Sequence, residues 1–243
     1  MKFELTYKKF GRQAILIEWP NRIDREILYD IIQYKKHLQN IYRTVDLEFV
    51  SAYNSLTIIT RKKQFDQEKQ IKEFQAAYEE QPKGTKQKIT LWKIPVCYET
   101  GHGMDMERLC ERKQLSRSDI IRLHTKNNYT VYGIGFLPGF MYLGGLVEAL
   151  HTPRLETPRL KVPKGAVAIG GSQTGIYPQE SPGGWNIIGR TPIPLFNTSK
   201  NPPCFVQVGD SIKFYSVSKP EYDLLTVQLA TGVFSLQKEE IKW

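Results

Sequence analysis

Hydrophobic and polar residues follow two different periods along the first 95 residues of the chain. In residues 13–19 every second residue is apolar, which is typical of a strand with one buried face. In residues 24–40, Ile27, Ile31 and Leu38 instead recur on one face of a helix. The same patterns predict further strands over residues 45–49, 56–60 and 89–96 and a second helix from Asp66 to about residue 80.

Residues that begin and end helices support this assignment. Asn21 or Asp24 can cap the first helix and Asp66 the second, because a short polar side chain can accept hydrogen bonds from the first free N–H groups. Pro82 and Gly84 then end the second helix. The resulting order, β-α-β-β-α-β, is that of a ferredoxin-like domain, which we expect to occupy residues 1–92.

Residues 93–243 have a different pattern and predict a second domain. Two short helices are expected over 105–113 and 117–125, and Ser116 with Asp119 matches a capping box at the start of the latter. After Tyr129 the chain has many short apolar runs with turn residues between them, which indicates a β-barrel or sandwich. The runs lie at residues 131–136, 166–169, 185–188, 205–208, 212–215 and 224–229.

Composition narrows the class of protein. Hydrophobic residues make up 40% and charged residues 24% of the chain, which favours a folded core over disorder. No stretch approaches about 20 consecutive apolar residues, so no membrane helix is expected. Residues 1–10 alternate apolar and polar side chains, unlike a signal peptide. A cytoplasmic protein is therefore expected.

Charge and cysteine content exclude several kinds of site. The chain has 34 basic and 25 acidic residues, a net charge of +9, and the excess is spread over both regions. Cys97, Cys110 and Cys204 are odd in number and far apart, which argues against a disulfide framework and a cysteine zinc site. Neither a metal nor an organic cofactor is indicated by the sequence.

The helices predicted over 105–125 have helix-turn-helix spacing, which raises the possibility of DNA binding. Arg117 and Arg122 are a weak basic face, so we expect no nucleic-acid partner.

Glycine and proline cluster in the stretch 133–192, which is the most unusual part of the sequence. The clusters lie at residues 135–139, 170–175 and 178–184. Glycine lets the backbone approach a ligand closely and proline stiffens a loop, so such loops can hold N–H groups toward an anion or an oxyanion. The same residues can equally form tight barrel turns, and the sequence leaves both interpretations open.

Few side chains in this stretch can take part in acid–base chemistry. No P-loop and no HExxH motif is present, and Thr174 occupies the place of the second glycine of a nucleophile elbow. Arg159 and Arg190 each adjoin a proline-flanked turn, where they could bind a carboxylate or phosphate, or cap turn carbonyls. A lone His124 is more often structural than catalytic.

Three blocks in this stretch resemble the signature sequences of a bacterial family. Its members carry the names 5-oxoprolinase B subunit, allophanate hydrolase subunit 1 and KipI. The blocks are GFLPGFMYLGGL at residues 135–146, TPRLKVPKG at 157–165 and GGSQTGIYPQESPGGWNIIGRTPIPLF at 170–196. The resemblance covers nearly the whole chain, although residues 10–19 match the first strand of the family only loosely.

The resemblance implies a fold and a function. It implies a small N-terminal α/β domain followed by a cyclophilin-like barrel, here over residues 93–243. It implies that the chain helps to cleave 5-oxo-L-proline to L-glutamate with ATP as co-substrate. The implied partners are the C subunit, of the allophanate hydrolase subunit 2 or KipA family, and the A subunit. Alternatives within the family are inhibition of a sensor histidine kinase and a role as allophanate hydrolase subunit 1.

The candidate binding site follows from these blocks, whereas no nucleophile or base can be assigned. Because the loops offer many donors and few acids or bases, we expect a site shared with a partner and a nearly inactive lone chain. Phe140, Tyr142 and Tyr177 mark a partner surface if they are exposed. The candidate substrate- or anion-binding residues are His124, Gly135, Phe136, Pro138, Gly139, Phe140, Arg159, Gln173, Thr174, Gly175, Tyr177, Glu180, Ser181, Gly183, Gly184, Trp185 and Arg190.

Overall fold

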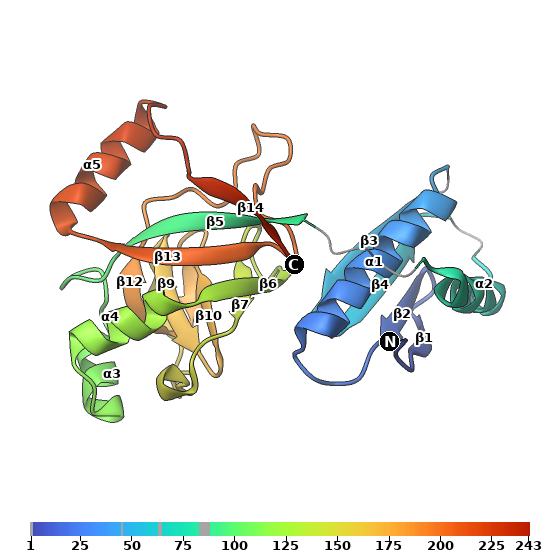
Figure 1. The fold of residues 1–243 in the computed structure, drawn as a ribbon, viewed down its shortest axis with the longest axis horizontal. Coiled ribbons are helices and arrows are strands. Elements are labelled where there is room, and N and C mark those ends of the chain that lie inside the picture. Colours follow the sequence, from blue (N-terminus) through green and yellow to red (C-terminus); the bar gives the residue numbers. More distant parts are fainter. Residues whose placement is uncertain (1, 45, 63–64, 83–87) are drawn as a thin grey trace. The chain divides into compact units, whose positions relative to one another are not determined.

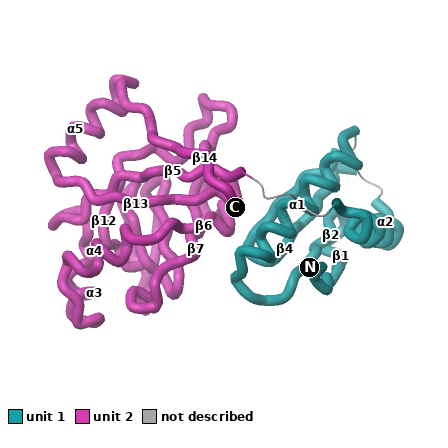
Figure 2. Tube along the Cα trace, viewed as in Figure 1, with its two compact units in different colours: residues 1–87 teal, residues 88–243 magenta. Residues whose placement is uncertain are grey.

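The protein folds as two compact units, Met1–Gln87 and Lys88–Trp243 (Figure 2). The computed structural model describes residues 2–44, 46–62, 65–82 and 88–243. Each unit has its own hydrophobic core, as the change of pattern along the sequence predicts. Residues 88–92, which were expected in the first domain, begin a strand of the second unit.

The first unit is an antiparallel sheet packed against two helices (Figure 1). Alternate strand residues such as Ile15, Ile17 and Ile58 are buried against the apolar faces of the helices. Asp24 and Asp66 cap the two helices, which confirms the caps predicted from the sequence. The sheet order is β1-β2-β4-β3, with β1 at Thr6–Phe10, β2 at Ala14–Glu18, β3 at Leu47–Ala52 and β4 at Ser55–Thr60, and the helices are α1 at Arg25–Ile41 and α2 at Gln67–Glu80.

The predicted membership of this sheet was wrong for one strand. The strand expected over 89–96 is β5, Lys88–Cys97, and it pairs within the barrel of the second unit. The edge of the first sheet is formed instead by β1, which makes a hairpin with β2 through the turn at Gly11. Apolar residues at every second position identify a strand but not its neighbours in the sheet, because strand pairing depends on contacts with distant parts of the chain.

The second unit is built on a closed β-barrel (Figure 1). Neighbouring strands follow the order β12-β9-β10-β7-β6-β13-β5, and β12 closes the ring by pairing with the end of β5, where Arg190 lies opposite Cys97. The remaining strand, β14, pairs with the start of β5. The strands are β6 at Asn128–Ile134, β7 at Met141–Gly144, β9 at Ala166–Gly170, β10 at Gln173–Ile176, β12 at Asn186–Arg190, β13 at Ser211–Val217 and β14 at Lys238–Lys242.

Helices α3 (Met106–Lys113) and α4 (Arg117–Lys126) lie where the sequence predicts them. The apolar run 224–229, expected as a strand, lies instead in a helix, α5 (Lys219–Ala230). The capping box of Ser218 and Glu221 begins this helix and is the sequence signal for it.

The run 205–208, also expected as a strand, forms none. Phe205 packs on the ring of Trp92. No helix in the described ranges is long and apolar enough to cross a membrane.

At β9 the barrel wall is apolar on both faces, and successive residues of the strand point to the inner and the outer side in turn. Val167 and Ile169 of β9 belong to the core inside the barrel, whereas Ala166 and Ala168 belong to a separate cluster. That cluster also contains Val162 of β8 (Arg159–Val162), which pairs with β11 (Ser181–Gly183). A short 3-10 helix, Glu148–Leu150, follows β7.

Aromatic rings fill this outer cluster, and glycines make the space for them. The ring of Phe140 packs at 5.2 Å from that of Tyr177 and at 5.6 Å from that of Trp185, measured between centroids. A Cβ atom added to Gly170 would lie 2.5 Å from the Trp185 indole, and one added to Gly183 would lie 2.3 Å from the Tyr177 hydroxyl. These glycines therefore allow close approach of a ring to the backbone.

Replacing Gly170 with alanine should destabilise the second unit. The added methyl group must displace the buried Trp185 ring, and such overpacking costs about 1–3 kcal/mol. Gly135→Ala is the matched control, because a Cβ atom there meets no atom within 4 Å. Denaturant unfolding followed by tryptophan fluorescence measures both variants. Equal stability of the two variants would show that the glycine is not needed for ring packing.

Candidate anion-binding site

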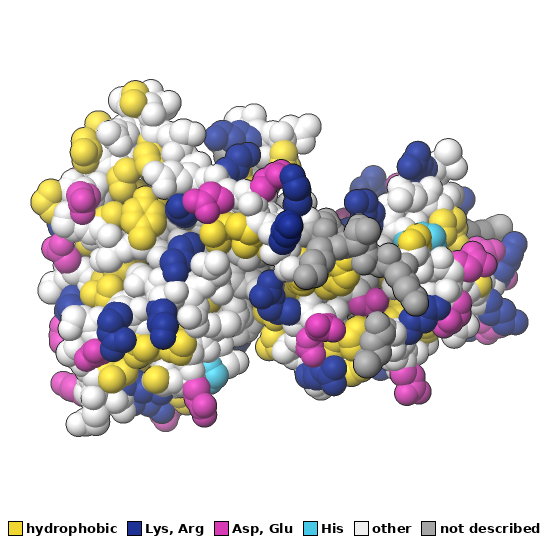
Figure 3. Space-filling model, viewed as in Figure 1, with side chains coloured by type: hydrophobic (Ala, Val, Ile, Leu, Met, Phe, Trp, Pro, Cys, Tyr) yellow, Lys and Arg dark blue, Asp and Glu magenta, His cyan; other side chains and the backbone are white. Residues whose placement is uncertain are grey.

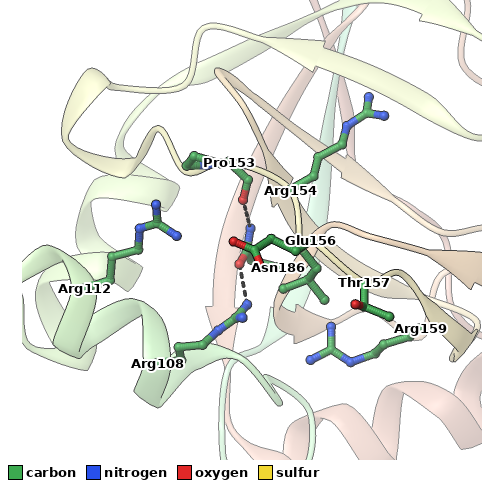
Figure 4. Close-up of a pocket in the computed structure, with 9 residues that line it drawn as sticks. Arg108, Arg112, Pro153, Arg154, Glu156, Thr157, Arg159 and Asn186 are labelled. Atoms are coloured by element: carbon green, nitrogen blue, oxygen red, sulfur yellow. Dashed lines mark hydrogen bonds between the residues drawn. The ribbon is translucent and has the colours of Figure 1, made fainter.

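A cleft of about 630 Å³ lies between helix α3, the segment 153–157 and the first residues of β8 and β12 (Figure 4). Its walls carry a cluster of arginines and a single acidic side chain among the residues that the structure describes. The lining residues are Arg108, Arg112, Pro153, Arg154, Leu155, Glu156, Thr157, Arg159 and Asn186.

A buried carboxylate, that of Asp105, positions two of the arginines. Asp105 is only 3% exposed and stands at the N-terminal end of α3. Its Oδ1 accepts a hydrogen bond from Nη2 of Arg159 at 2.5 Å and lies 3.2 Å from Nη2 of Arg108. Its Oδ2 accepts from the backbone N–H of Ile187 at 2.7 Å. The carboxylate is thus paired and hydrogen-bonded, which is the condition for burying a charge.

The first residues of β12 hold the other components of the cleft. Arg108 donates from Nη2 to Oδ1 of Asn186 at 2.6 Å, and the Asn186 amide donates to the carbonyl of Pro153 (Figure 4). The same amide also donates to the carbonyl of Ile169. The guanidinium of Arg154 lies over the Trp185 ring, 5.7 Å from its centroid. Such a cation–π contact restrains an otherwise exposed side chain.

Sequence reasoning identified only part of this cleft. Of the predicted site residues, Arg159 lines it. Trp185 supports it from behind, and the carbonyl of Gly184 accepts from the N–H of Leu155, which fixes the segment 153–157. Arg108 and Arg112 were missed, although their spacing of four on a predicted helix places them on one face.

Other predicted site residues lie in or next to the aromatic cluster. Phe140 and Tyr177 are buried, so the exposure that would mark them as a partner surface is not observed, and Tyr142 is half-buried. Gly175, like Gly183, faces an aromatic ring, and Ser181 is buried on β11. Gly135, Phe136, Pro138 and Gly139 form the loop between β6 and β7, where Phe136 is 65% exposed at a φ of 62°.

The remaining predicted residues are distributed elsewhere. Glu180 is exposed, and its Oε1 lies 3.7 Å from Nζ of Lys161. Gln173 is half-buried on β10. Arg190 is not part of the cleft lining, and it donates from Nε to the carbonyl of Lys164 at 2.8 Å. Arg190 therefore caps a barrel turn, which is one of the two roles that the sequence left open.

His124 and Thr174 lie inside the barrel and form a closed chain of hydrogen bonds. The Thr174 hydroxyl donates to the carbonyl of Ala168, so it accepts from Nε2 of His124 at 2.9 Å. Nδ1 of His124 then accepts from the hydroxyl of Tyr98 at 2.8 Å. Burial lowers the pKa of His124 to about 3, and the neutral ring is a structural part of the core.

On the face in Figure 3, lysine and arginine side chains alternate with acidic and apolar ones. On the helix pair considered for DNA binding, Arg117 contacts Glu107 and the carbonyl of Tyr98, and Arg122 pairs with Asp119. All three cysteines are free. Within the described ranges, no group of three or more His, Cys, Asp or Glu side chains is placed to hold a metal ion.

Comparison with known proteins identifies the class of protein to which the chain belongs. Residues 5–206 match the family described as carboxyltransferase domain, subdomain C and D. The 5-oxoprolinase B subunit of Haemophilus influenzae is 41% identical over 179 residues, which are 69% of this chain and 78% of that protein. The protein of the same name from Bacillus subtilis is 43% identical over 129 residues, 53% of this chain. That match spans 54% of the relative, about half its length.

A solved structure shares the fold. The urea amidolyase of Kluyveromyces lactis superposes with a TM-score of 0.82 at 20% identity, over 99% of this chain and 16% of that one. The chain is therefore a carboxyltransferase-type domain protein built on a closed barrel and an α/β unit. It belongs to the family of 5-oxoprolinase B subunits.

Replacing Asp105 with asparagine should destabilise the second unit by about 2–3 kcal/mol, because Arg159 and Arg108 lose the charge that compensates them. Asp223→Asn is the matched control. Its carboxylate pairs with Lys219 on the surface of α5, where such pairs contribute about 0.3–0.5 kcal/mol. Urea unfolding at neutral pH gives both values. A loss no larger than that of the control would mean that Asp105 does not organise the cleft.

The buried His124 should make stability depend on pH. The folded-state pKa of about 3 is below the ordinary value of 6.5, so the unfolded state binds the proton more readily. The stability that the neutral His124 contributes is complete above about pH 6.5. It is lost as pH falls toward 3, by at most about 1.4 kcal/mol per pH unit. His124→Gln cannot titrate and should have a shallower slope in urea unfolding between pH 6.5 and 4. Parallel slopes would contradict a neutral, buried imidazole.

Proposed function

We propose that the chain is the B subunit of an ATP-dependent 5-oxoprolinase, which cleaves 5-oxo-L-proline to L-glutamate. The observation that supports this most directly is the arginine cleft, found in a chain 41% identical to the 5-oxoprolinase B subunit of Haemophilus influenzae. The substrate is a carboxylate, and guanidinium groups bind carboxylates through two parallel hydrogen bonds. Arg108 and Arg159 are held ready for such an interaction by Asp105.

The lactam ring also requires activation of its carbonyl, because an amide is stable in water. Phosphorylation of the carbonyl oxygen by ATP would supply it, and arginine donors would stabilise the charge that develops there. Among the described residues of the lining, the exposed Glu156 is the only carboxylate, and no histidine or cysteine is present. We therefore propose that a partner protein completes the site.

The partners proposed are the C subunit, of the allophanate hydrolase subunit 2 or KipA family, and the A subunit. ATP is the co-substrate of the complex, and the absence of a P-loop from this sequence favours its binding on another protein of the complex. We place the complex in the cytoplasm. We also propose that the second unit has the cyclophilin-like fold that the resemblance implies.

The proposal is tested with the purified chain and its C and A partner proteins. The mixture should form glutamate from 5-oxoproline in the presence of ATP, whereas the chain alone should have less than a few per cent of that rate. Arg159→Ala should lower kcat/KM of the complex about 10- to 100-fold, as expected for loss of a charge-assisted hydrogen bond of about 1.5–3 kcal/mol.

Arg122→Ala, which removes the same charge outside the cleft, is the control and should leave the rate unchanged. No glutamate from a well-folded complex would contradict the proposed reaction, and a full rate from the lone chain would contradict a shared site. Parallel assays with allophanate, and with a histidine kinase whose autophosphorylation is followed, separate the alternative functions.

A further inference from the structure

We propose that the arginine cleft binds a dianion, a small molecule that carries two negatively charged groups, at least one of them a carboxylate. This inference deepens the proposed function and depends on it only for the identity of the natural ligand, because 5-oxo-L-proline carries one carboxylate and its product L-glutamate carries two. It follows from the charge balance of the cleft, the unused donors on its walls and its size.

The charge balance of the cleft favours two negative charges. Among the described residues, Arg108, Arg112, Arg154 and Arg159 contribute four positive charges to the lining. Glu156 offsets one of them, and Asp105, directly behind the lining, offsets a second. The remaining balance is 4 − 2 = +2. A ligand with one negative charge would leave part of this charge without a partner, whereas a dianion compensates it.

The inner part of the cleft has a fixed geometry and unused donors. Arg108 and Arg159 share Oδ1 of Asp105, and Arg108 also donates to Asn186. Nη1 of Arg159 is buried and has no acceptor within the described parts of the chain. Buried donors are normally satisfied, so this atom needs an acceptor, either a bound water or a group of a ligand, that the described residues do not supply. The inner part is therefore suited to a first anionic group.

The outer part of the cleft is formed by Arg112 and Arg154, which come from different elements. Arg112 follows Arg108 by one turn of α3, and it makes no ion pair with the residues that the structure describes. Arg154 extends from the segment 153–157 and rests on Trp185. In Figure 4 the four guanidinium groups lie on different sides of Asn186. A second anionic group can thus be bound apart from the first.

The size of the cleft is consistent with such a ligand. A volume of about 630 Å³ lies within the range of small-molecule sites, about 300–1,000 Å³. A single carboxylate would contact only one part of the wall. Two carboxylates on a short chain, or a carboxylate and a phosphate, share the required chemistry.

The test is calorimetric titration of the full chain at low ionic strength. The probes are glutarate, which has two carboxylates, butyrate, which has one, and inorganic phosphate. Glutarate should bind at least about 10-fold more tightly than butyrate, because it forms one additional charge-assisted contact. Inorganic phosphate binding tighter than glutarate would contradict the proposal, because phosphate is a single anionic group without a carboxylate. Glutarate binding tighter than phosphate would support a dicarboxylate.

Arg112→Ala should abolish the preference for glutarate over butyrate and leave the affinity for butyrate within about 2-fold, because the inner arginines remain. Arg122→Ala is the matched control, since it removes an exposed arginine of α4 that lies outside the cleft. It should leave the preference intact. Both side chains are exposed, and thermal unfolding verifies that both variants are folded.

Equal affinity for glutarate and butyrate, or an equal loss of preference in Arg112→Ala and Arg122→Ala, would overturn the proposal. The second result would mean that overall charge attracts the anions. The outcomes are distinct from those for the proposed function. A complex that forms no glutamate, together with selective glutarate binding, would refute only the function. An active complex without such selectivity would refute only the dianion site.

Discussion

The buried carboxylate of Asp105 is the interaction on which the cleft depends. It joins the start of α3, the first residue of β8 and the backbone of β12 through Arg159, Arg108 and the N–H of Ile187. A charge can be buried only where it is paired, so these elements must come together for the unit to fold. The same pairing fixes two guanidinium groups at the cleft before any ligand arrives, which lowers the entropy cost of binding.

Three consecutive residues at the start of β12 extend this arrangement. Trp185, Asn186 and Ile187 hold Arg154, Arg108 and Asp105 respectively. The Trp185 ring can occupy its place because Gly170 and Gly175 present no side chain to it. The glycine-rich blocks of the sequence therefore serve packing behind the cleft, and we propose that the side chains of the cleft serve binding. A wall with arginines on several sides suits electrostatic binding better than acid–base chemistry.

Local interactions explain which parts of the fold could be predicted. The caps at Asp24, Asp66 and Ser116 depend on residues within a few positions, so the sequence reveals them directly. Where a segment pairs depends on distant contacts, and prediction therefore failed for β5, which joins the barrel and not the first sheet. The run 224–229 shows a related limit, because alternating apolar residues also fit a helix once Ser218 and Glu221 begin one.

For the candidate site, the sequence by itself determined the family, through the blocks at 135–196, and the presence of arginines beside proline turns. The sequence could not assign different roles to Arg159 and Arg190, since both adjoin proline-flanked turns. Only the tertiary structure placed Arg159 beside Asp105, 54 residues away, and Arg190 on the carbonyl of Lys164. The cleft unites α3, the segment 153–157 and β12, and charge pairing between such distant segments exists only after the barrel has closed.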